Sequence, residues 1–196
     1  MITDRLKKQL EFMIELDKMK NLYRQTYVLH EDRKENDAEH SWHIAVMAFL
    51  LEEYANFPVN TLKVIKMLLI HDVVEIDAGD TYRYDEKGYK TKADREEKAA
   101  QRIFGILPEE QKEEFYSLWR EFEDCQTNEA RFASVLDRIQ PMLLNYTKSG
   151  ISWQEHGVYK NQVEKINAGT AEISENLAEV IKTVIDDATE KGWLKI

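Results

Sequence analysis

Two adjacent side chains that can bind metal, His71 and Asp72, interrupt an otherwise apolar run from Met67 to Val74. An unpaired carboxylate is costly to bury there, because it loses its hydration without gaining a counter-charge. A metal ion would supply that charge, and imidazole and carboxylate groups are both common ligands of divalent metals. The alternative interpretation is a core histidine that hydrogen-bonds to a neighbouring acid.

Glu75 brings a third polar group to the same stretch. At about 100° per residue, a helix places Glu75 on the same side as His71 and Asp72. Asp80 follows shortly after, next to the turn residue Gly79. Glu75 and the apolar surroundings strengthen the metal-binding interpretation, although residue spacing alone leaves both interpretations open.

A second segment carries His40 and His43, one helical turn apart. His40 shares a helix face with Ile44, Met47 and Leu51, so its imidazole is expected to point inward. His43 lies on nearly the same side. Spacing alone does not distinguish a metal ligand from a histidine that hydrogen-bonds to one.

Asp137 is a third candidate, although it lies about 150° from the apolar stripe of its predicted helix. Ala133 and Leu144 border it, which indicates a helix buried on two sides. Pro141, four residues later, removes the helical hydrogen bond to the Asp137 carbonyl and favours a bend there. A bend at a carboxylate is more typical of a functional site than of exposed surface.

Helices are the elements expected to position these groups, because the chain has only 7 glycines and 3 prolines for turns. The periodicity predicts helices over 3–20, from Asn36 or Asp37 to about 54, 59–75, 92–105, from 107 onward and 128–148, with one or two more to follow. The segments 21–36, 76–92 and 149–157 are expected to be loops. The helix over 59–75 is apolar on almost every face, which predicts a central position.

The predicted fold class is therefore all-α. A single domain over 1–196 is expected, with a core of about 5–150 on which helices in 158–192 pack.

Composition excludes several classes of partner. The formal net charge of −10 disfavours nucleic-acid polymers and anionic membranes. The single cysteine, Cys125, rules out an internal disulfide and fits a reducing compartment. Neither a signal peptide nor an apolar run of about 20 residues is recognisable, so a cytoplasmic location is expected.

The order of these residues resembles the His…His-Asp…Asp skeleton of the HD-domain metal-dependent phosphohydrolases. Residues 33–41 (RKENDAEHS) and 71–80 (HDVVEIDAGD) are similar to the YfbR-like 5′-deoxynucleotidase group within them. Arg24 falls where that group carries an arginine. The similarity extends over most of residues 5–150, and it implies an all-helical HD-domain fold whose central buried helix carries the His-Asp pair.

The resemblance implies one divalent cation, held by a set of four ligands: His40, His71, Asp72 and Asp137. Two imidazoles and two carboxylates suit Mn²⁺, Co²⁺, Fe²⁺, Ni²⁺ or Zn²⁺ better than Mg²⁺, which prefers oxygen ligands. A second metal would require further histidines, and His30, His43 and His156 lack the expected spacing. One metal is therefore expected.

The resemblance also implies roles for the neighbouring residues. Glu75 is expected to orient the attacking water or to transfer its proton, and Asp80 to contact the sugar or protonate the leaving 5′-oxygen. How the two carboxylates divide the acid and base roles stays open. Arg24 is expected to clamp the phosphate, and Arg33 and Thr81 to contribute to substrate binding.

The function predicted from these residues is release of the 5′-phosphate from (deoxy)nucleoside 5′-monophosphates. Two alternatives remain, a phosphohydrolase acting on another nucleotide or small phosphomonoester, and a non-catalytic helical module that binds metal or nucleotide. The resemblance further implies a homodimer.

Overall fold

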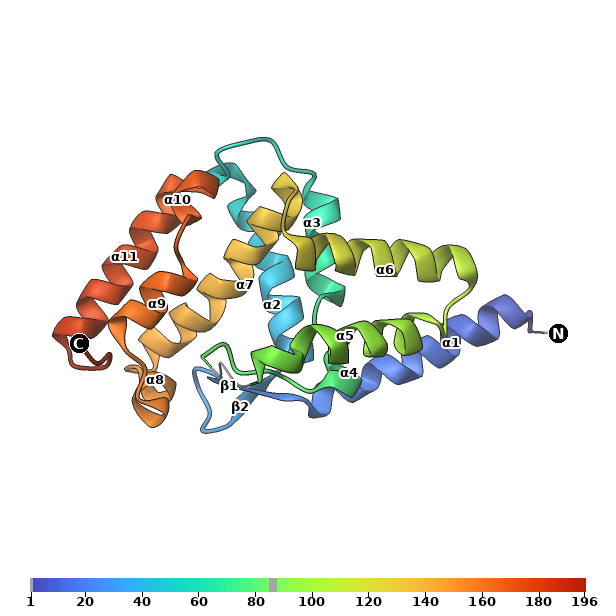
Figure 1. Ribbon diagram of the computed structural model, residues 1–196, viewed down its shortest axis with the longest axis horizontal. Coiled ribbons are helices and arrows are strands. Elements are labelled where there is room, and N and C mark those ends of the chain that lie inside the picture. The colour runs from blue at the N-terminus through green and yellow to red at the C-terminus, as the bar shows by residue number, and fades with distance from the viewer. Residues whose placement is uncertain (1, 85–87) are drawn as a thin grey trace.

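Helices dominate the computed structural model, which describes residues 2–84 and 88–196, and they confirm the predicted all-α class (Figure 1). The elements in chain order are α1 (Asp4–Leu16), η1 (Asp17–Asn21), β1 (Tyr23–Tyr27), β2 (Lys34–Asn36), α2 (Asp37–Leu51), η2 (Glu52–Tyr54), α3 (Thr61–Ile70), α4 (Glu75–Ala78), α5 (Tyr89–Phe104), α6 (Glu109–Asp124), α7 (Asn128–Thr147), α8 (Ile151–His156), α9 (Lys160–Ile166), α10 (Thr170–Ile173) and α11 (Glu175–Glu190). Within the described residues, no helix is both long and apolar enough to cross a membrane.

Helix α7 lies at the centre of the fold. Its Phe132, Val135 and Leu136 are fully buried and belong to the larger hydrophobic core, which α2, α3 and α11 also supply. A second core joins α1, α5 and α6 around Phe104 and Trp119. Figure 1 shows α7 between the C-terminal helices on one side and α2 and α3 on the other. Pro141 does not end α7, which continues to Thr147.

The prediction of one helix over 59–75 is wrong at its C-terminal end. Helix α3 stops at Ile70, a tight turn follows, and α4 begins at Glu75. In that turn the amide of Glu75 donates to the carbonyl of Asp72 at 2.9 Å, an i-to-i+3 bond in place of the α-helical pattern. His71 and Asp72 therefore lie at a helix end rather than on a continuous face, where their backbone turns them toward α7.

The prediction of a loop over 21–36 is also wrong, because this segment contains the antiparallel pair β1 and β2, with Tyr23 opposite Asn36 and Tyr27 opposite Lys34. Side chains alternate along a strand, so Arg24 and Thr26 share one face, and Thr26 is buried. The hairpin thus directs Arg24 inward. In the predicted loop 149–157 the structure has α8, and residues 85–87 of the predicted loop 76–92 lie outside the described residues.

A capping box fixes the start of α2. The side chain of Asn36 accepts from the backbone amide of Glu39 at 2.9 Å, and Glu39 accepts in return from the amide of Asn36 at 3.2 Å. The first turn of α2, which ends in His40, is thereby held directly after β2. The prediction that this helix begins at Asn36 or Asp37 is confirmed.

Candidate metal centre

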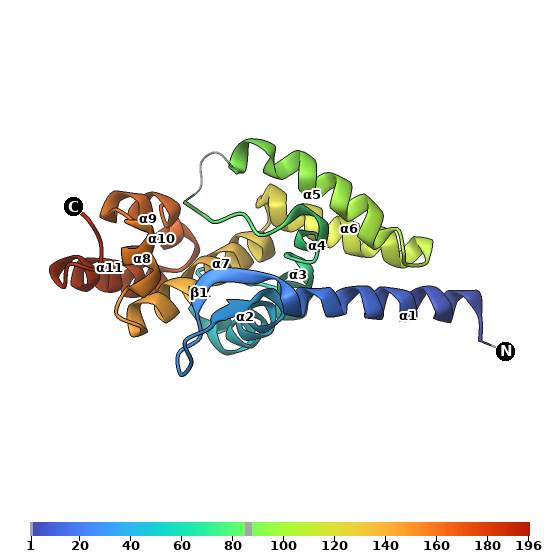
Figure 2. The same cartoon turned by 90° about the horizontal axis from the view of Figure 1, so that it is seen from below.

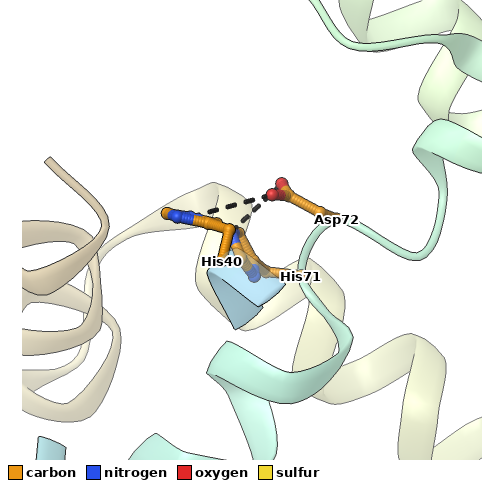
Figure 3. Close-up of side chains that lie close together, drawn as sticks. All are labelled: His40, His71 and Asp72. Atoms are coloured by element: carbon orange, nitrogen blue, oxygen red, sulfur yellow. Dashed lines mark ion pairs between the residues drawn. The ribbon is translucent and has the colours of Figure 1, made fainter. Parts of the chain in front are cut away.

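Three helices bring the four expected ligands together. His40 comes from α2, His71 and Asp72 follow α3, and Asp137 lies in the middle of α7; all four are buried. The Nε2 atom of His40 lies 3.1 Å from Asp137 Oδ1, and that of His71 lies 3.1 Å from Asp72 Oδ1. His40 Nε2 also lies 3.9 Å from Asp72 Oδ2, and His71 Nε2 lies 3.7 Å from Asp137 Oδ1, so each imidazole is near both carboxylates. Figure 3 shows His40 and His71 turned toward the Asp72 carboxylate.

The orientation of the two imidazoles fits a bound cation. His40 Nδ1 lies 2.9 Å from Gln140 Oε1, and His71 Nδ1 lies 2.9 Å from the Leu68 carbonyl, so each Nδ1 is placed to donate its proton. Both Nε2 lone pairs then face carboxylates, an arrangement that requires either a proton or a metal ion between them. His71 Nε2 is buried and forms no hydrogen bond within the described part of the chain. The donor set suits a divalent transition metal.

Gln140 connects His40 to a second buried acid. Its amide nitrogen donates to Glu35 Oε1 at 2.6 Å and lies 3.1 Å from His43 Nδ1. His43 therefore contacts Gln140, whereas His40 faces the cluster. Burial raises the pKa of Glu35 to about 7. Gln140 and Glu35 were not expected from the sequence, although Gln140 lies one helical turn after Asp137 and so shares its side of α7.

Burial and the surrounding charges set the protonation of the cluster. Burial disfavours the imidazolium of His71, but the adjacent carboxylates of Asp72 and Asp137 outweigh it and raise the pKa of His71 to about 10. For His40, burial and then the charge of Arg24 lower the pKa to about 4. Burial opposes ionisation of Asp72, yet His71 and Arg24 hold the pKa of that carboxyl well below its usual range. The cluster thus holds its carboxylates ionised.

A second group of acids adjoins the cluster. Asp37, Asp72 and Glu75 each offer an oxygen within 4.8 Å of the others. Arg24 Nη1 donates to Asp72 at 2.6 Å and to Asp37 at 3.3 Å, so the expected phosphate clamp lies at the site. Burial and the charge of Asp72 raise the pKa of Asp37 to about 7, and burial also raises the pKa values of Glu75 and Asp80. Asp37 was not expected, but it lies three residues before His40 on the same helix face.

The other two expected substrate-binding residues differ in position. Thr81 lines the cavity at the site, and its hydroxyl accepts from Arg95 at 2.9 Å. Arg33 is exposed and donates to Glu39 at 2.7 Å and to Glu31 at 2.8 Å. The structure does not bring Arg33 to the cluster, because the carboxylate of the α2 capping box binds its guanidinium group.

A cavity of about 280 Å³ opens beside the cluster. It follows one face of α7 and reaches α8 and α9; the α7 residues that line it are Ser134, Asp137, Arg138, Pro141, Met142 and Asn145. Two unexpected arginines lie in its wall. Arg83 donates to Asp137 Oδ2, and Arg138 donates to Ser134 Oγ at 2.8 Å. Burial and then the positive charge of Arg83 lower the pKa of Arg138.

In this helical fold, buried histidines and aspartates from three helices converge beside a cavity. Such an arrangement is typical of the class of proteins with an enclosed divalent-metal site. Within that class, the chain belongs to the HD domain family, whose model matches residues 16–179. This confirms the resemblance found in the sequence.

Individual relatives agree with this assignment. The chain is 30% identical over 135 residues to the 5′-deoxynucleotidase HDDC2 of Homo sapiens, which covers 68% of this chain and 65% of that protein. It is 32% identical over 143 residues to 5′-deoxynucleotidase HDDC2 of Dictyostelium discoideum, covering 70% of this chain and 75% of that one. A crystal structure described as a predicted metal-dependent phosphohydrolase from Magnetospirillum magnetotacticum MS-1 superposes with a TM-score of 0.93 at 46% identity, over 99% and 100% of the two chains.

Replacement of Gln140 by leucine is expected to weaken metal binding by about 10- to 100-fold, because His40 Nδ1 loses the acceptor that orients its ring. Titration of the metal-free protein with Mn²⁺ measures the effect. Gln101→Leu, at an exposed position of α5, is the control and should bind Mn²⁺ like the wild type. Equal affinities for all three proteins would show that Gln140 does not position His40.

Metal binding near neutral pH is expected to release about one proton. His71 is protonated below its pKa of about 10, and a metal ion binds only the neutral imidazole. His40, with a pKa of about 4, is already neutral and releases none. Apparent affinity should therefore rise as the pH is raised from about 6 to about 8. Calorimetry in buffers of different ionisation enthalpy counts the protons, and an affinity independent of pH would contradict the prediction.

Proposed function

We propose that this chain is a metal-dependent phosphohydrolase that removes the 5′-phosphate from (deoxy)nucleoside 5′-monophosphates. The observation that carries the proposal is the convergence of His40, His71, Asp72 and Asp137 beside a cavity of about 280 Å³ that Arg24 also lines. The relatives named 5′-deoxynucleotidase support this substrate class, since they share the family and about 30% identity.

The proposed cofactor is one divalent ion held by these four side chains, with Mn²⁺, Co²⁺, Ni²⁺, Fe²⁺ or Zn²⁺ preferred over Mg²⁺ because two ligands are imidazoles. Such an ion polarises a phosphoryl oxygen and makes a bound water more acidic. His40 and His71 hold their Nε2 atoms toward it, while Gln140 and the Leu68 carbonyl fix the two rings from behind.

The protein's own acids carry the proton transfers in this proposal. Glu75 is buried beside Asp72, and its raised pKa suits a group that accepts a proton from the attacking water. Asp80 also has a raised pKa and lines the cavity, so it is placed to contact the sugar or to protonate the leaving 5′-oxygen. Arg24 neutralises charge that develops on the phosphoryl group.

Phosphate release from nucleoside monophosphates, with Mn²⁺, Co²⁺ and Mg²⁺ supplied in turn, tests this function. Asp72→Asn, which keeps the side-chain volume but removes the charge, should lose Mn²⁺ binding and phosphate release together. Asp124→Asn, at the exposed end of α6, should keep both. Absence of release from every mono-, di- and triphosphate by the metal-loaded wild type would refute the hydrolase assignment and favour a binding module.

We further propose that the protein is a homodimer formed through the apolar surfaces of α1 and α2. We also propose a cytosolic location, which the single free cysteine, Cys125, fits. Trp42, Phe49 and Leu50 on α2 are 65%, 66% and 59% exposed, and Ile14 on α1 is 74% exposed. Figure 2 shows α1 and α2 along the same edge of the molecule. Large exposed apolar side chains on helices along one edge of a molecule are typical of a protein interface.

Light scattering coupled to size-exclusion chromatography is expected to give twice the chain mass of 23.1 kDa. Phe49→Glu should shift the mass toward one chain, because a charge cannot be buried unpaired in an apolar interface. Val180→Glu, on α11 and 41% exposed, is the control and should leave the mass unchanged. A wild-type protein of single-chain mass would refute the dimer.

A further inference from the structure

We propose that the end of the cavity formed by α7, α8 and α9 binds the base of the nucleotide, and that Asn145 and Asn167 recognise this base. The proposal rests on the proposed function in taking the substrate to be a nucleotide. The position of the base site follows from the polarity of the cavity and from the hydrogen-bonding groups that its wall leaves unused.

The cavity changes in character from one end to the other. At one end it meets the charged groups of the metal cluster, Asp72 and Asp137 among them. At the other end α8 and α9 supply its wall, and none of their described residues that line it is charged. Figures 1 and 2 show α8 and α9 near the C-terminal half of α7. A nucleotide has the same polarity, because its phosphate is charged and its base is neutral.

Helix α7 connects the two ends of the cavity. Asp137, Pro141 and Asn145 recur every four residues and all line the cavity, so they lie on nearly one side of the helix. At about 1.5 Å per residue, Asn145 lies about 12 Å along the axis from Asp137. The sugar separates the phosphate of a nucleotide from its base. A nucleotide with its phosphate at the metal cluster therefore extends along α7 and brings its base toward Asn145.

Asn145 offers the cavity a hydrogen-bond donor. The residue is only 7% exposed, and its Oδ1 accepts from the backbone amide of Ser152 at 3.1 Å, which fixes the orientation of the side-chain amide. The Nδ2 group forms no hydrogen bond with another described residue. Polar groups of buried residues nearly always have a partner, so this free donor in a cavity wall indicates a ligand that carries acceptors.

Asn167, directly after α9, offers an acceptor. Its Nδ2 donates to the carbonyl of Val163 at 2.9 Å, while its Oδ1 is buried and has no donor among the described residues. Asn167 lines the same cavity as Asn145. The edges of nucleobases carry both acceptors and N–H donors, whereas a phosphate dianion offers only acceptors. A donor together with an acceptor therefore matches a base better than a second phosphate.

Aromatic rings offer contacts to the flat faces of a base. Tyr82, Tyr84 and Trp153 line the cavity. The ring centroids of Tyr82 and Tyr84 are 5.2 Å apart in a T-shaped arrangement, and those of Tyr82 and His156 are 4.5 Å apart. Aromatic side chains stack on any base, because every base has a π-face. The rings thus supply affinity, and the two asparagines supply selectivity.

Binding of the four 2′-deoxynucleosides to the Mn²⁺-loaded protein, measured by calorimetry, tests the proposal without a hydrolysis step. Asn145→Leu and Asn167→Leu each remove one hydrogen-bonding group and should weaken the binding of at least one deoxynucleoside by about 3- to 10-fold. Inorganic phosphate, which has no base, should bind to both variants as it binds to the wild type. Asn128→Leu and Asn161→Leu make the same change at exposed positions of α7 and α9, and these controls should bind deoxynucleosides normally.

A further variant separates the base contact from the packing of α8. Asn145→Asp keeps the oxygen that accepts from Ser152 and replaces only the donor, so it should show the same loss of deoxynucleoside binding as Asn145→Leu.

The outcomes separate this proposal from the proposed function. No deoxynucleoside binding by the wild type, or unchanged binding in Asn145→Leu or Asn167→Leu, would overturn the base site even if nucleotides are hydrolysed. Loss of phosphate binding in the two leucine variants would also overturn it, because the asparagines would then support the cavity as a whole. Weakened deoxynucleoside binding with normal phosphate binding supports the base site, and it does so even if no nucleotide is hydrolysed.

Discussion

The burial of ionised carboxylates next to imidazoles is the constraint on which the structure of this HD domain depends. Asp72 and Asp137 lie in the interior, where an uncompensated charge would be strongly destabilising. Arg24, His71 and Arg83 surround them and supply positive charge from a hairpin, a helix end and a loop. The cluster is therefore held together by its own cations.

The surrounding elements are arranged to bring these charges together. Helix α3 ends just before His71, so the His-Asp pair lies on a turn rather than on a straight rod. The hairpin of β1 and β2 directs Arg24 inward, and the capping box at Asn36 fixes the turn that carries His40. Each element is ordinary by itself. Together they place donors from distant parts of the chain within a few ångströms of each other.

Helix α7 has two buried faces with different tasks. One face packs Leu136 and its neighbours into the larger core. Elsewhere on the helix, Asp137 and Gln140 contact His40, and Arg138 lines the cavity. Apolar contacts with the core fix the backbone of α7, and hydrogen bonds fix its polar side chains. These polar groups are therefore held rigidly.

The sequence by itself determined the all-α class, the main helices and the family, because helical periodicity is a local pattern and the His…His-Asp…Asp order can be read along the chain without the fold. It also singled out Asp137 despite an unfavourable helical phase, and the structure places this carboxylate 3.1 Å from His40 Nε2. Only the tertiary structure decided where α3 ends, that residues 23–27 and 34–36 pair as strands, and that Glu39 holds Arg33 at the surface. It also decided that Asp37 lies beside Asp72 and that Arg138 lines the cavity. These features depend on contacts between distant segments, and the free energy of burying and pairing charges outweighs the local preferences that a sequence pattern records.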